Sequence, residues 1–301
     1  MSSTSTDIDK LIEEEFSRNI GLLSESEQKR MLESRIAVAG AGGVGGLHIL
    51  TLARLGIGKF NIADNDIFER VNISRQFGAN THTMGQNKAG VLGQMVKDIN
   101  CHADVRMFHD GINSDNISAF LDGVDIFVDG LDFFAIDIRR LAFRASRERG
   151  IIALTSAPLG FGATLEVFSP TGMSFDDYFN ISDDMTYLEK MAAFAAGLAP
   201  HPYHIRYVDM SKVSLAKRTG PAVSLACTLA ASLIASEVVK IITGKDKVYP
   251  VPHYLQIDLL RGKFKRGYIL MGGRNPLQKL KKWMILKKAQ SMNIEDNGQQ
   301  L

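Results

Sequence analysis

Residues 36–46 read IAVAGAGGVGG, a short apolar run that meets a cluster of glycines and continues into a second apolar segment. A strand, a phosphate-cradling turn and a helix give this pattern in sequence. Gly40, Gly42 and Gly45 have the spacing of dinucleotide-binding turns, where glycine permits a tight turn and close approach of the backbone to phosphate. The spacing alone suits NAD and ATP equally well.

The segments around these glycines alternate between strand-like and helix-like patterns. We expect strands at residues 35–39, 59–63, 104–108, 124–128 and 151–154. We expect helices at residues 45–55, 87–100, 117–121 and 136–149. Strands that alternate with helices form right-handed βαβ units and a mainly parallel sheet flanked by helices. Residues 162–168 then predict an antiparallel strand, so the predicted fold class is α/β, Rossmann-like, with an antiparallel extension in the C-terminal half.

The chain divides into three regions around this core. Residues 1–33 look helical, with a break near residues 21–26. Residues 34–276 are expected to form one domain, in which residues 170–220 are an irregular crossing loop. Residues 277–301 are expected to form a basic C-terminal tail.

The most apolar segment lies at residues 221–243 and ends at Gly244, and a further strand is expected at residues 253–258. Glu237 and Lys240 interrupt the apolar segment, which argues against a membrane span. We expect this helix to serve both as core and as dimer interface.

Composition excludes several classes of protein. The net charge of +2 is too small to indicate a nucleic-acid-binding protein by itself. The only cysteines, Cys101 and Cys227, are too few for a disulfide framework or a four-cysteine zinc site, and we expect both to be small buried hydrophobes. The N-terminus has no apolar signal-peptide core, so the expected localisation is cytoplasmic.

Charged residues beyond the glycines favour ATP over NAD. Asp64 follows the second expected strand, where a carboxylate can accept hydrogen bonds from ribose hydroxyls. Arg75 can bind phosphate oxygens bidentately, and Lys88 supplies a point charge at the start of a helix. Asp132 ends the segment DGLD after the fourth expected strand. Next to a triphosphate it is a suitable Mg²⁺ ligand, because Mg²⁺ prefers one or two carboxylates plus phosphates.

At these residues the chain resembles the ubiquitin-activating-enzyme-like adenylyltransferases, the ThiF/MoeB/HesA family. The resemblance runs from about residue 16 to about residue 276. It rests on the glycine turn, Asp64, NISRQ at residues 72–76, GQNK at residues 85–88 and DGLD at residues 129–132, in that order. The segment FSRNI at residues 16–20 resembles the family's N-terminal segment, whose arginine crosses a homodimer interface to the partner's ATP. The resemblance gives that role to Arg18.

The resemblance implies an enzyme that makes an acyl-adenylate from ATP and a carboxylate, with release of pyrophosphate. Such an enzyme positions two anions and stabilises charge on phosphate, so it needs no protein nucleophile. The expected catalytic residues are Arg75, Lys88, Asp132 and Arg18, with Mg²⁺ on Asp132. The expected nucleotide-binding residues are Gly40, Gly42, Gly43, Gly45, Asp64, Asp66, Asn72 and Gln76. Arg54 is a further candidate.

The sequence departs from the family in two ways. Many relatives hold structural zinc with two Cys-x-x-Cys pairs, but this chain has FDDYF at residues 175–179 and RNPLQKLK at residues 274–281. We therefore expect no zinc. Ubiquitin-type activators form a thioester on a cysteine in the crossing loop, and residues 160–220 contain no cysteine. We therefore expect adenylation without an enzyme thioester.

The identity of the substrate carboxylate has several alternatives. The resemblance implies the C-terminus of a ubiquitin-like or sulfur-carrier protein, a peptide, or a tRNA-modifying reaction. An NAD-dependent oxidoreductase is a third hypothesis, but it leaves Arg75 and Lys88 without a task. Residues 259–294 contain ten Lys and Arg but no Asp or Glu. Such a segment suits RNA phosphates, an anionic membrane surface or an acidic protein, or it is a solvated helix that covers its own domain.

Overall fold

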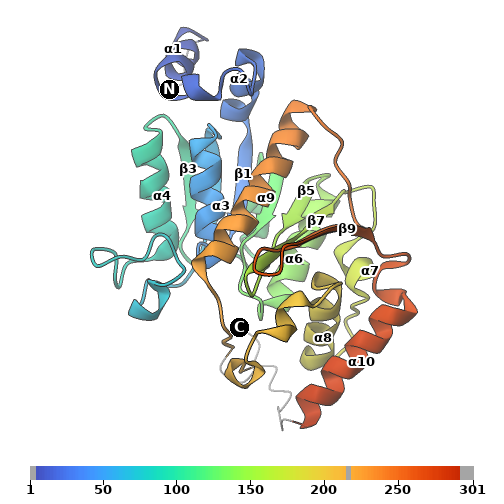
Figure 1. Ribbon diagram of the computed structural model, residues 1–301. Coiled ribbons are helices and arrows are strands. Elements are labelled where there is room, and N and C mark those ends of the chain that lie inside the picture. Colours follow the sequence, from blue (N-terminus) through green and yellow to red (C-terminus); the bar gives the residue numbers. More distant parts are fainter. Residues whose placement is uncertain (1–4, 215–217, 292–301) are drawn as a thin grey trace.

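The computed structural model describes residues 5–214 and 218–291, and its centre is a nine-stranded sheet with the order β3-β2-β1-β4-β5-β7-β8-β9, in which β6 pairs with β7 (Figure 1). The strands are β1 (Arg35–Ala39), β2 (Lys59–Ala63), β3 (Asp104–Phe108), β4 (Ile126–Asp129), β5 (Ile152–Thr155), β6 (Pro158–Leu159), β7 (Gly162–Phe168), β8 (His253–Asp258) and β9 (Lys263–Tyr268). β1 to β5 are parallel, and β6 to β9 extend the sheet with antiparallel pairing. The expected α/β class is confirmed.

The order of the parallel strands fixes where a ligand can bind. From β1 the chain moves outward through β2 to β3, and then returns to β4 on the other side of β1. Ala39 at the end of β1 pairs with Ala63 of β2 and with Asp129 of β4. The carboxyl ends of β1 and β4 therefore form the topological switch point, where ligands bind in open α/β sheets.

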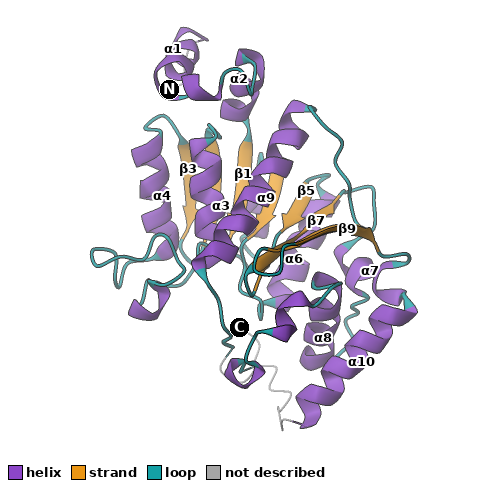
Figure 2. Cartoon of the chain, in the orientation of Figure 1, coloured by secondary structure: helices purple, strands orange, loops and turns teal. Residues whose placement is uncertain are grey.

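Helices cover both faces of the sheet (Figure 2). Ile36 and Val38 of β1 pack into a core with α3, α4 and α9, whereas Ala37 and Ala39 face a second core with α5, α6 and α8. This alternation is the two-residue period of a strand buried on both faces. The helices are α1 (Ser5–Glu15), α2 (Glu25–Glu33), α3 (Gly43–Arg54), α4 (Lys88–Ile99), α5 (Ile117–Phe120), α6 (Ile136–Glu148), α7 (Phe175–Phe179), α8 (Tyr187–Leu198), α9 (Ser224–Thr243) and α10 (Pro276–Ser291).

The N-terminal segment is helical as predicted, but its break lies at residues 16–24, earlier than the predicted residues 21–26. α1 ends at Glu15, a short 3-10 helix covers Ser17–Asn19, and α2 begins after Ser24. The Ser24 side chain accepts a hydrogen bond from the backbone N–H of Glu27, and the Glu27 carboxylate accepts one from the backbone N–H of Ser24. This reciprocal cap fixes the start of α2 and ends the break.

The crossing segment is more regular than the sequence predicted. It contains α7, α8 and two 3-10 helices, Tyr203–Arg206 and Met210–Lys212. α8 begins with a second reciprocal cap between Thr186 and Glu189. Phe194 of α8 then packs in mutual ring contact with Phe175 and Phe179 of α7. Local capping and aromatic burial, rather than a long periodic pattern, make this segment helical.

After the crossing segment the chain contains the expected helix α9 and the expected strand β8, followed by β9 and α10, for which no bounds were predicted. α9 is long and apolar enough to span a membrane by length and composition, yet Ile234 and Val238 pack in the core formed with the sheet. β9 forms the edge of the sheet beside β8. α10 packs against α8 and carries residues 276–291 of the region expected as a tail. Residues 1–4 and 292–301 of the expected terminal regions lie outside the described residues.

Candidate nucleotide-binding site

The glycine turn joins β1, α3 and the loop after β4 in backbone contact. Gly40 has a φ of +89°, and a Cβ atom there would overlap the carbonyl oxygen of Gly130. A Cβ atom at Gly45 would overlap the carbonyl oxygen of Gly40. Gly42 caps the N-terminus of α3, which begins at Gly43. Only glycine permits this packing, and the exposed N–H groups of the helix start favour an anion.

Asp64 connects the end of β2 to this turn. Its Oδ2 atom accepts a hydrogen bond of 2.6 Å from the backbone N–H of Ala41, and Oδ1 accepts one of 2.8 Å from Asp66. Burial raises the pKa of the Asp64 carboxyl, while these hydrogen bonds and the charge of Lys88 oppose the rise. The carboxylate therefore lies against the glycine turn, and its role as a ribose ligand stays a prediction.

Lys88 lies at the first position of α4, beside Asp64 and Asp66. Its Nζ atom is 2.8 Å from Oδ2 of Asp66, and its side chain is 7% exposed against 67% for Asp66. Asn87 caps α4 at Gly90 and donates a hydrogen bond to the carbonyl oxygen of Asp64. The ion pair therefore holds a buried cation at the edge of the predicted site.

Arg75 and Gln76 lie on the other side of the turn. The aliphatic Cγ atom of Arg75 lies 3.8 Å from where a Cβ atom at Gly43 would be, and its guanidinium donates to the carbonyl oxygen of Val71. The buried amide of Gln76 lies 3.5 Å from where a Cβ atom at Gly42 would be. Its Oε1 atom has no hydrogen-bond partner among the described residues. This buried, unpaired oxygen lies beside a turn that carries no side chains, so it can accept a hydrogen bond from a ligand bound there.

Asn72 has a structural contact in addition to its predicted role. Its Oδ1 atom accepts a hydrogen bond of 2.9 Å from the backbone N–H of Glu69. The backbone N–H groups of Arg75 and Gln76 donate to the carbonyl oxygen of Asn72. Asn72 therefore shapes the turn that carries Arg75 and Gln76.

Asp132 lies in the loop after β4, two residues beyond Gly130. Its exposed carboxylate accepts a hydrogen bond of 2.9 Å from the backbone N–H of Phe134. Because Gly130 packs against Gly40, this loop borders the glycine turn. Asp132 is therefore on the same edge of the sheet as Asp64.

Arg139 of α6 supports this loop and was not among the predicted site residues. Its Nε atom donates to Oδ2 of Asp129 at 2.7 Å, and both side chains are almost completely buried. Its Nη2 atom donates to the carbonyl oxygens of Leu131 and Asp132. Its position on the first turn of the helix after DGLD was the only signal in the sequence.

Arg18 and Arg54 lie away from the glycine turn of their own chain. Arg54 is the last residue of α3, and the eleven helical steps from Gly43 place it roughly 16 Å away. The suggestion that Arg54 reaches the site is therefore wrong for its own chain. Arg18 lies near the same end of α3, because the neighbouring Asn19 donates to the carbonyl oxygen of Leu55. Arg18 remains a prediction that requires a second subunit.

The two cysteines differ in environment. Cys227 of α9 is buried as expected, and its Sγ atom lies 3.3 Å from where a Cβ atom at Gly43 would be. Burial raises the pKa of this thiol, which Arg75 only partly offsets, so it is a packing residue rather than a nucleophile. Cys101 is exposed, and its predicted burial is wrong because it lies in the turn after α4.

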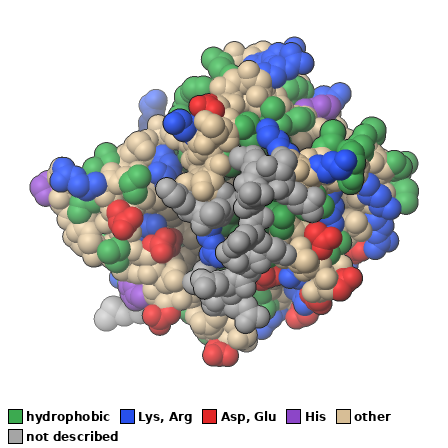
Figure 3. Space-filling view, turned by 90° about the horizontal axis from the view of Figure 1, so that it is seen from below, with side chains coloured by type: hydrophobic (Ala, Val, Ile, Leu, Met, Phe, Trp, Pro, Cys, Tyr) green, Lys and Arg blue, Asp and Glu red, His purple; other side chains and the backbone are tan. Residues whose placement is uncertain are grey.

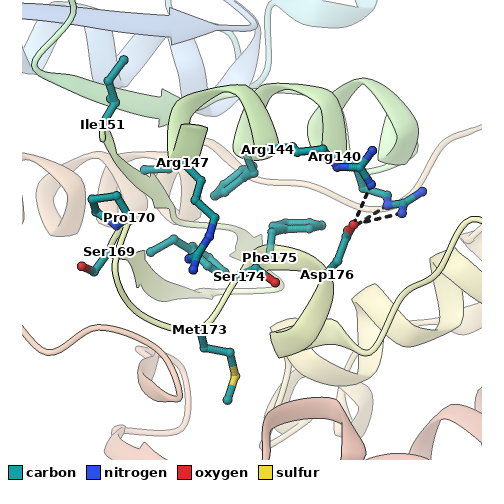
Figure 4. Close-up of a pocket in the computed structure, with 13 residues that line it drawn as sticks. Arg140, Arg144, Arg147, Ile151, Ser169, Pro170, Met173, Ser174, Phe175 and Asp176 are labelled. Carbon is teal, nitrogen blue, oxygen red and sulfur yellow. Dashed lines mark hydrogen bonds and ion pairs between the residues drawn. The ribbon is translucent and has the colours of Figure 1, made fainter. Parts of the chain in front are cut away.

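A separate hollow of about 120 Å³ lies between α6 and the segment before α7 (Figure 4). Its arginines are held mainly by acids: Arg140 donates to Asp176 and Asp183, and Arg144 donates to Asp176. These hydrogen bonds, Asp176 first, raise the pKa of Arg140. This hollow is an ion-pair cluster and contains none of the predicted site residues.

Within residues 5–214 and 218–291, no group of three or more His, Cys, Asp or Glu side chains is assembled that could hold a metal ion. A magnesium ion that enters with ATP does not need such a group, because phosphates and water fill most of its coordination sphere. The assignment of Mg²⁺ to Asp132 therefore stays a prediction.

The fold and the site define a nucleotide-binding α/β protein with cations and a carboxylate around a glycine turn at the switch point. The model of the ThiF family matches residues 16–276, and the chain belongs to that family. The predicted resemblance is confirmed.

Two curated relatives match short stretches. One is the probable molybdopterin-synthase adenylyltransferase of Porphyra purpurea, 36% identical over 89 residues, which are 30% of this chain and 23% of the relative. The other is the tRNA threonylcarbamoyladenosine dehydratase of Haemophilus influenzae, 38% identical over 93 residues, 31% of this chain and 36% of the relative. The chain therefore matches only about a quarter to a third of these relatives.

The fold has solved counterparts. MccB of E. coli, solved with selenomethionine MccA, superposes with a TM-score of 0.66 at 17% identity, over 91% of this chain and 76% of that chain. At this identity the likeness concerns the fold.

Proposed function

We propose that the protein adenylates a substrate carboxylate with ATP and releases pyrophosphate. The observation that carries the proposal is the arrangement of Arg75, Lys88 and Asp64 around one glycine turn at the switch point. Two cations beside a phosphate-binding turn suit a triphosphate, whereas hydride transfer from NAD has no use for them. Membership in the ThiF family and the named adenylyltransferase among the relatives support the proposal.

In the proposed reaction the substrate carboxylate attacks the α-phosphate of ATP, and the bond to pyrophosphate breaks. Arg75 and Lys88 stabilise the negative charge that grows on the phosphate oxygens, and the start of α3 binds phosphate through backbone N–H groups. Asp64 accepts hydrogen bonds from the ribose, and Asn72 shapes the phosphate-binding turn. Asp132 would hold Mg²⁺, which neutralises phosphate charge when it is bound.

The proposed substrate is the C-terminal carboxylate of a ubiquitin-like or sulfur-carrier protein, or of a peptide. The acyl-adenylate is the product or reacts with an external nucleophile, since residues 160–220 carry no cysteine for a thioester. The protein is proposed to act as a cytoplasmic homodimer with ATP and Mg²⁺ and without zinc. The relative named as a tRNA threonylcarbamoyladenosine dehydratase supports a second candidate, in which the carboxylate lies on a modified tRNA base.

ATP–pyrophosphate exchange tests the proposal. The probes are a synthetic peptide that ends in a Gly-Gly carboxylate and, separately, total tRNA. We expect exchange in the wild-type protein with the peptide, and a loss of about 100-fold in Lys88→Gln, since one charge-stabilising contact is worth that much. Lys97→Gln, on the exposed side of the same helix, is the matched control.

The outcomes separate the candidates. Exchange with tRNA but not with the peptide would support the second candidate, the reaction on a modified tRNA base. No exchange with either probe would count against adenylation of both substrates. Undiminished exchange in Asp132→Ala would remove Asp132 from the mechanism. Equal exchange in Lys88→Gln and the wild type would overturn the phosphate role of Lys88.

A further inference from the structure

The C-terminal segment exposes apolar side chains more densely than the rest of the described chain. Ten of the nineteen exposed large hydrophobic side chains in residues 5–214 and 218–291 lie between Leu259 and Met284. All charged residues from Leu259 to Ser291 are Lys or Arg. Adenylation by the site at β1 and β4 does not account for this combination.

α10 carries the clearest part of this surface. Gln278 and Ala289 are buried on the side that packs against α8, and Lys281 donates to the carbonyl oxygen of Pro200 there. The opposite side is apolar as well. We call it the α10 outer face, and its residues are Leu277, Leu280, Trp283 and Met284, between 49% and 68% exposed. Their spacing of three and four residues places them on one side of the helix.

Lysines surround the α10 outer face. Lys279 and Lys287 are exposed beside it, and Nζ of Lys287 lies 4.3 Å from the ring centre of Trp283. All five basic residues of α10 are lysines. Figure 3 shows hydrophobic and basic side chains together along the right-hand margin, on the side where α10 lies in Figure 1.

We propose that the α10 outer face binds the surface of an anionic lipid membrane. Half-exposed Leu and Met side chains need an apolar medium, which the acyl boundary of a bilayer supplies. Lysines extend toward lipid phosphates while their stems cover apolar surface, and Trp is suited to the headgroup boundary.

The same features disfavour RNA as the binding partner of the α10 outer face. RNA recognition uses stacking aromatics and the planar guanidinium of arginine, and α10 has no arginine. Leu277, Leu280 and Met284 would remain exposed against a phosphate backbone. With sixteen residues, α10 is about 24 Å long, so it would lie along the membrane surface and would not cross it.

Co-sedimentation of the full chain with vesicles tests this proposal. The vesicles contain equal parts phosphatidylglycerol and phosphatidylcholine, or phosphatidylcholine alone. We expect sedimentation with the anionic vesicles and at least about fivefold less with the neutral ones, since each lysine near an anionic surface contributes to binding. The unfolding midpoint of each variant shows whether it is folded.

Two double variants separate the apolar contribution to vesicle binding from the contribution of charge. The double variant Leu280→Gln and Met284→Gln should lower partitioning by roughly tenfold, whereas Ile205→Gln, an equally exposed position elsewhere, should not. The double variant Lys279→Gln and Lys287→Gln should remove the preference for anionic lipid, whereas Lys10→Gln with Lys97→Gln should not.

Specific outcomes would overturn the proposal. These are wild-type protein that stays in the supernatant with anionic vesicles, or partitioning unchanged in the Leu280→Gln and Met284→Gln variant. Binding of total tRNA that depends on Lys279 and Lys287, without vesicle binding, would identify RNA as the occupant. Self-association by light scattering that the Leu280→Gln and Met284→Gln variant abolishes, again without vesicle binding, would identify a second copy of the chain.

Discussion

At Gly45 a single missing Cβ atom permits the contact that forms the nucleotide turn. The added atom in Gly45→Ala would overlap the backbone carbonyl oxygen of Gly40, which cannot rotate away as a side chain can. We expect the free energy of unfolding to fall by at least about 2 kcal/mol, as in other overpacked cores. Urea unfolding measures this free energy. Gly172→Ala is the control, since its added atom meets only ordinary contacts at Ser169, and an equal loss in both variants would contradict the argument.

The burial of His48 in α3 makes the free energy of unfolding depend on pH. It is fully buried, neither ring nitrogen has a hydrogen-bond partner among the described residues, and burial lowers its pKa from 6.5 to about 3. Between pH 6.5 and 3 the unfolded chain therefore binds a proton that the folded chain does not. Stability should fall as pH drops through this window, by up to about 1.4 kcal/mol per pH unit.

Replacement of His48 by leucine tests this dependence. The free energy of unfolding of His48→Leu should fall less steeply between pH 6.5 and pH 4.5 than that of the wild type. His201 and His204 also have pKa values lowered by burial, and their contribution is the same in both proteins. Parallel curves for the two proteins would show that His48 takes up a proton in the folded state.

The sequence predicted residues whose role follows from local spacing, and it missed those whose role follows from tertiary contact. Gly40, Asp64 and Lys88 each stand at the end of a strand or the start of a helix, so element positions bring them together. Arg139 and Cys227 reach the turn region only through packing of α6 and α9. For Cys227 nothing in the local sequence indicates that contact, and for Arg139 the one local sign is its position on the first helical turn after DGLD.

At the scale of elements, the parallel strands were predictable because each is a short apolar run before a turn. β1, β2 and β3 begin and end at the expected residues, and β4 and β5 differ by one or two. α7 and α8 were not predictable from periodicity, since α7 is short and α8 is apolar on most sides. Their caps at Ser174 and Thr186 were the overlooked signal.

The loop after β4 depends on one buried ion pair, which gives the prediction at this scale. Arg139→Met leaves the carboxylate of Asp129 buried with Thr155 as its remaining side-chain donor. We expect a loss of roughly 3–5 kcal/mol in the free energy of unfolding, measured by urea titration. Arg106→Met breaks the exposed pair with Asp122 and should cost less than about 1 kcal/mol. Similar losses in the two variants would contradict the assigned role of Arg139.

At the scale of the whole molecule, the predicted site residues come from the carboxyl ends of β1, β2 and β4 and from the starts of α3 and α4. Arg18 is the exception. It lies near Leu55, at the end of α3 opposite Gly43, with the length of that helix between them. If Arg18 binds ATP phosphates, they are those of a second subunit, so a homodimer is a requirement of its predicted role.

Mixing two inactive variants tests both the dimer and the role of Arg18. In Arg18→Ala every site lacks the partner's arginine, and in Lys88→Gln every site lacks its own lysine, so each variant alone should lose ATP–pyrophosphate exchange. After unfolding and refolding together, half of the dimers are mixed, and each contains one site with both cations. Exchange should recover to about a quarter of the wild-type rate, as expected for random pairing in a two-fold symmetric dimer. A mixture as inactive as its components would show that Arg18 does not act across subunits, and full activity of Arg18→Ala alone would show that it is not needed.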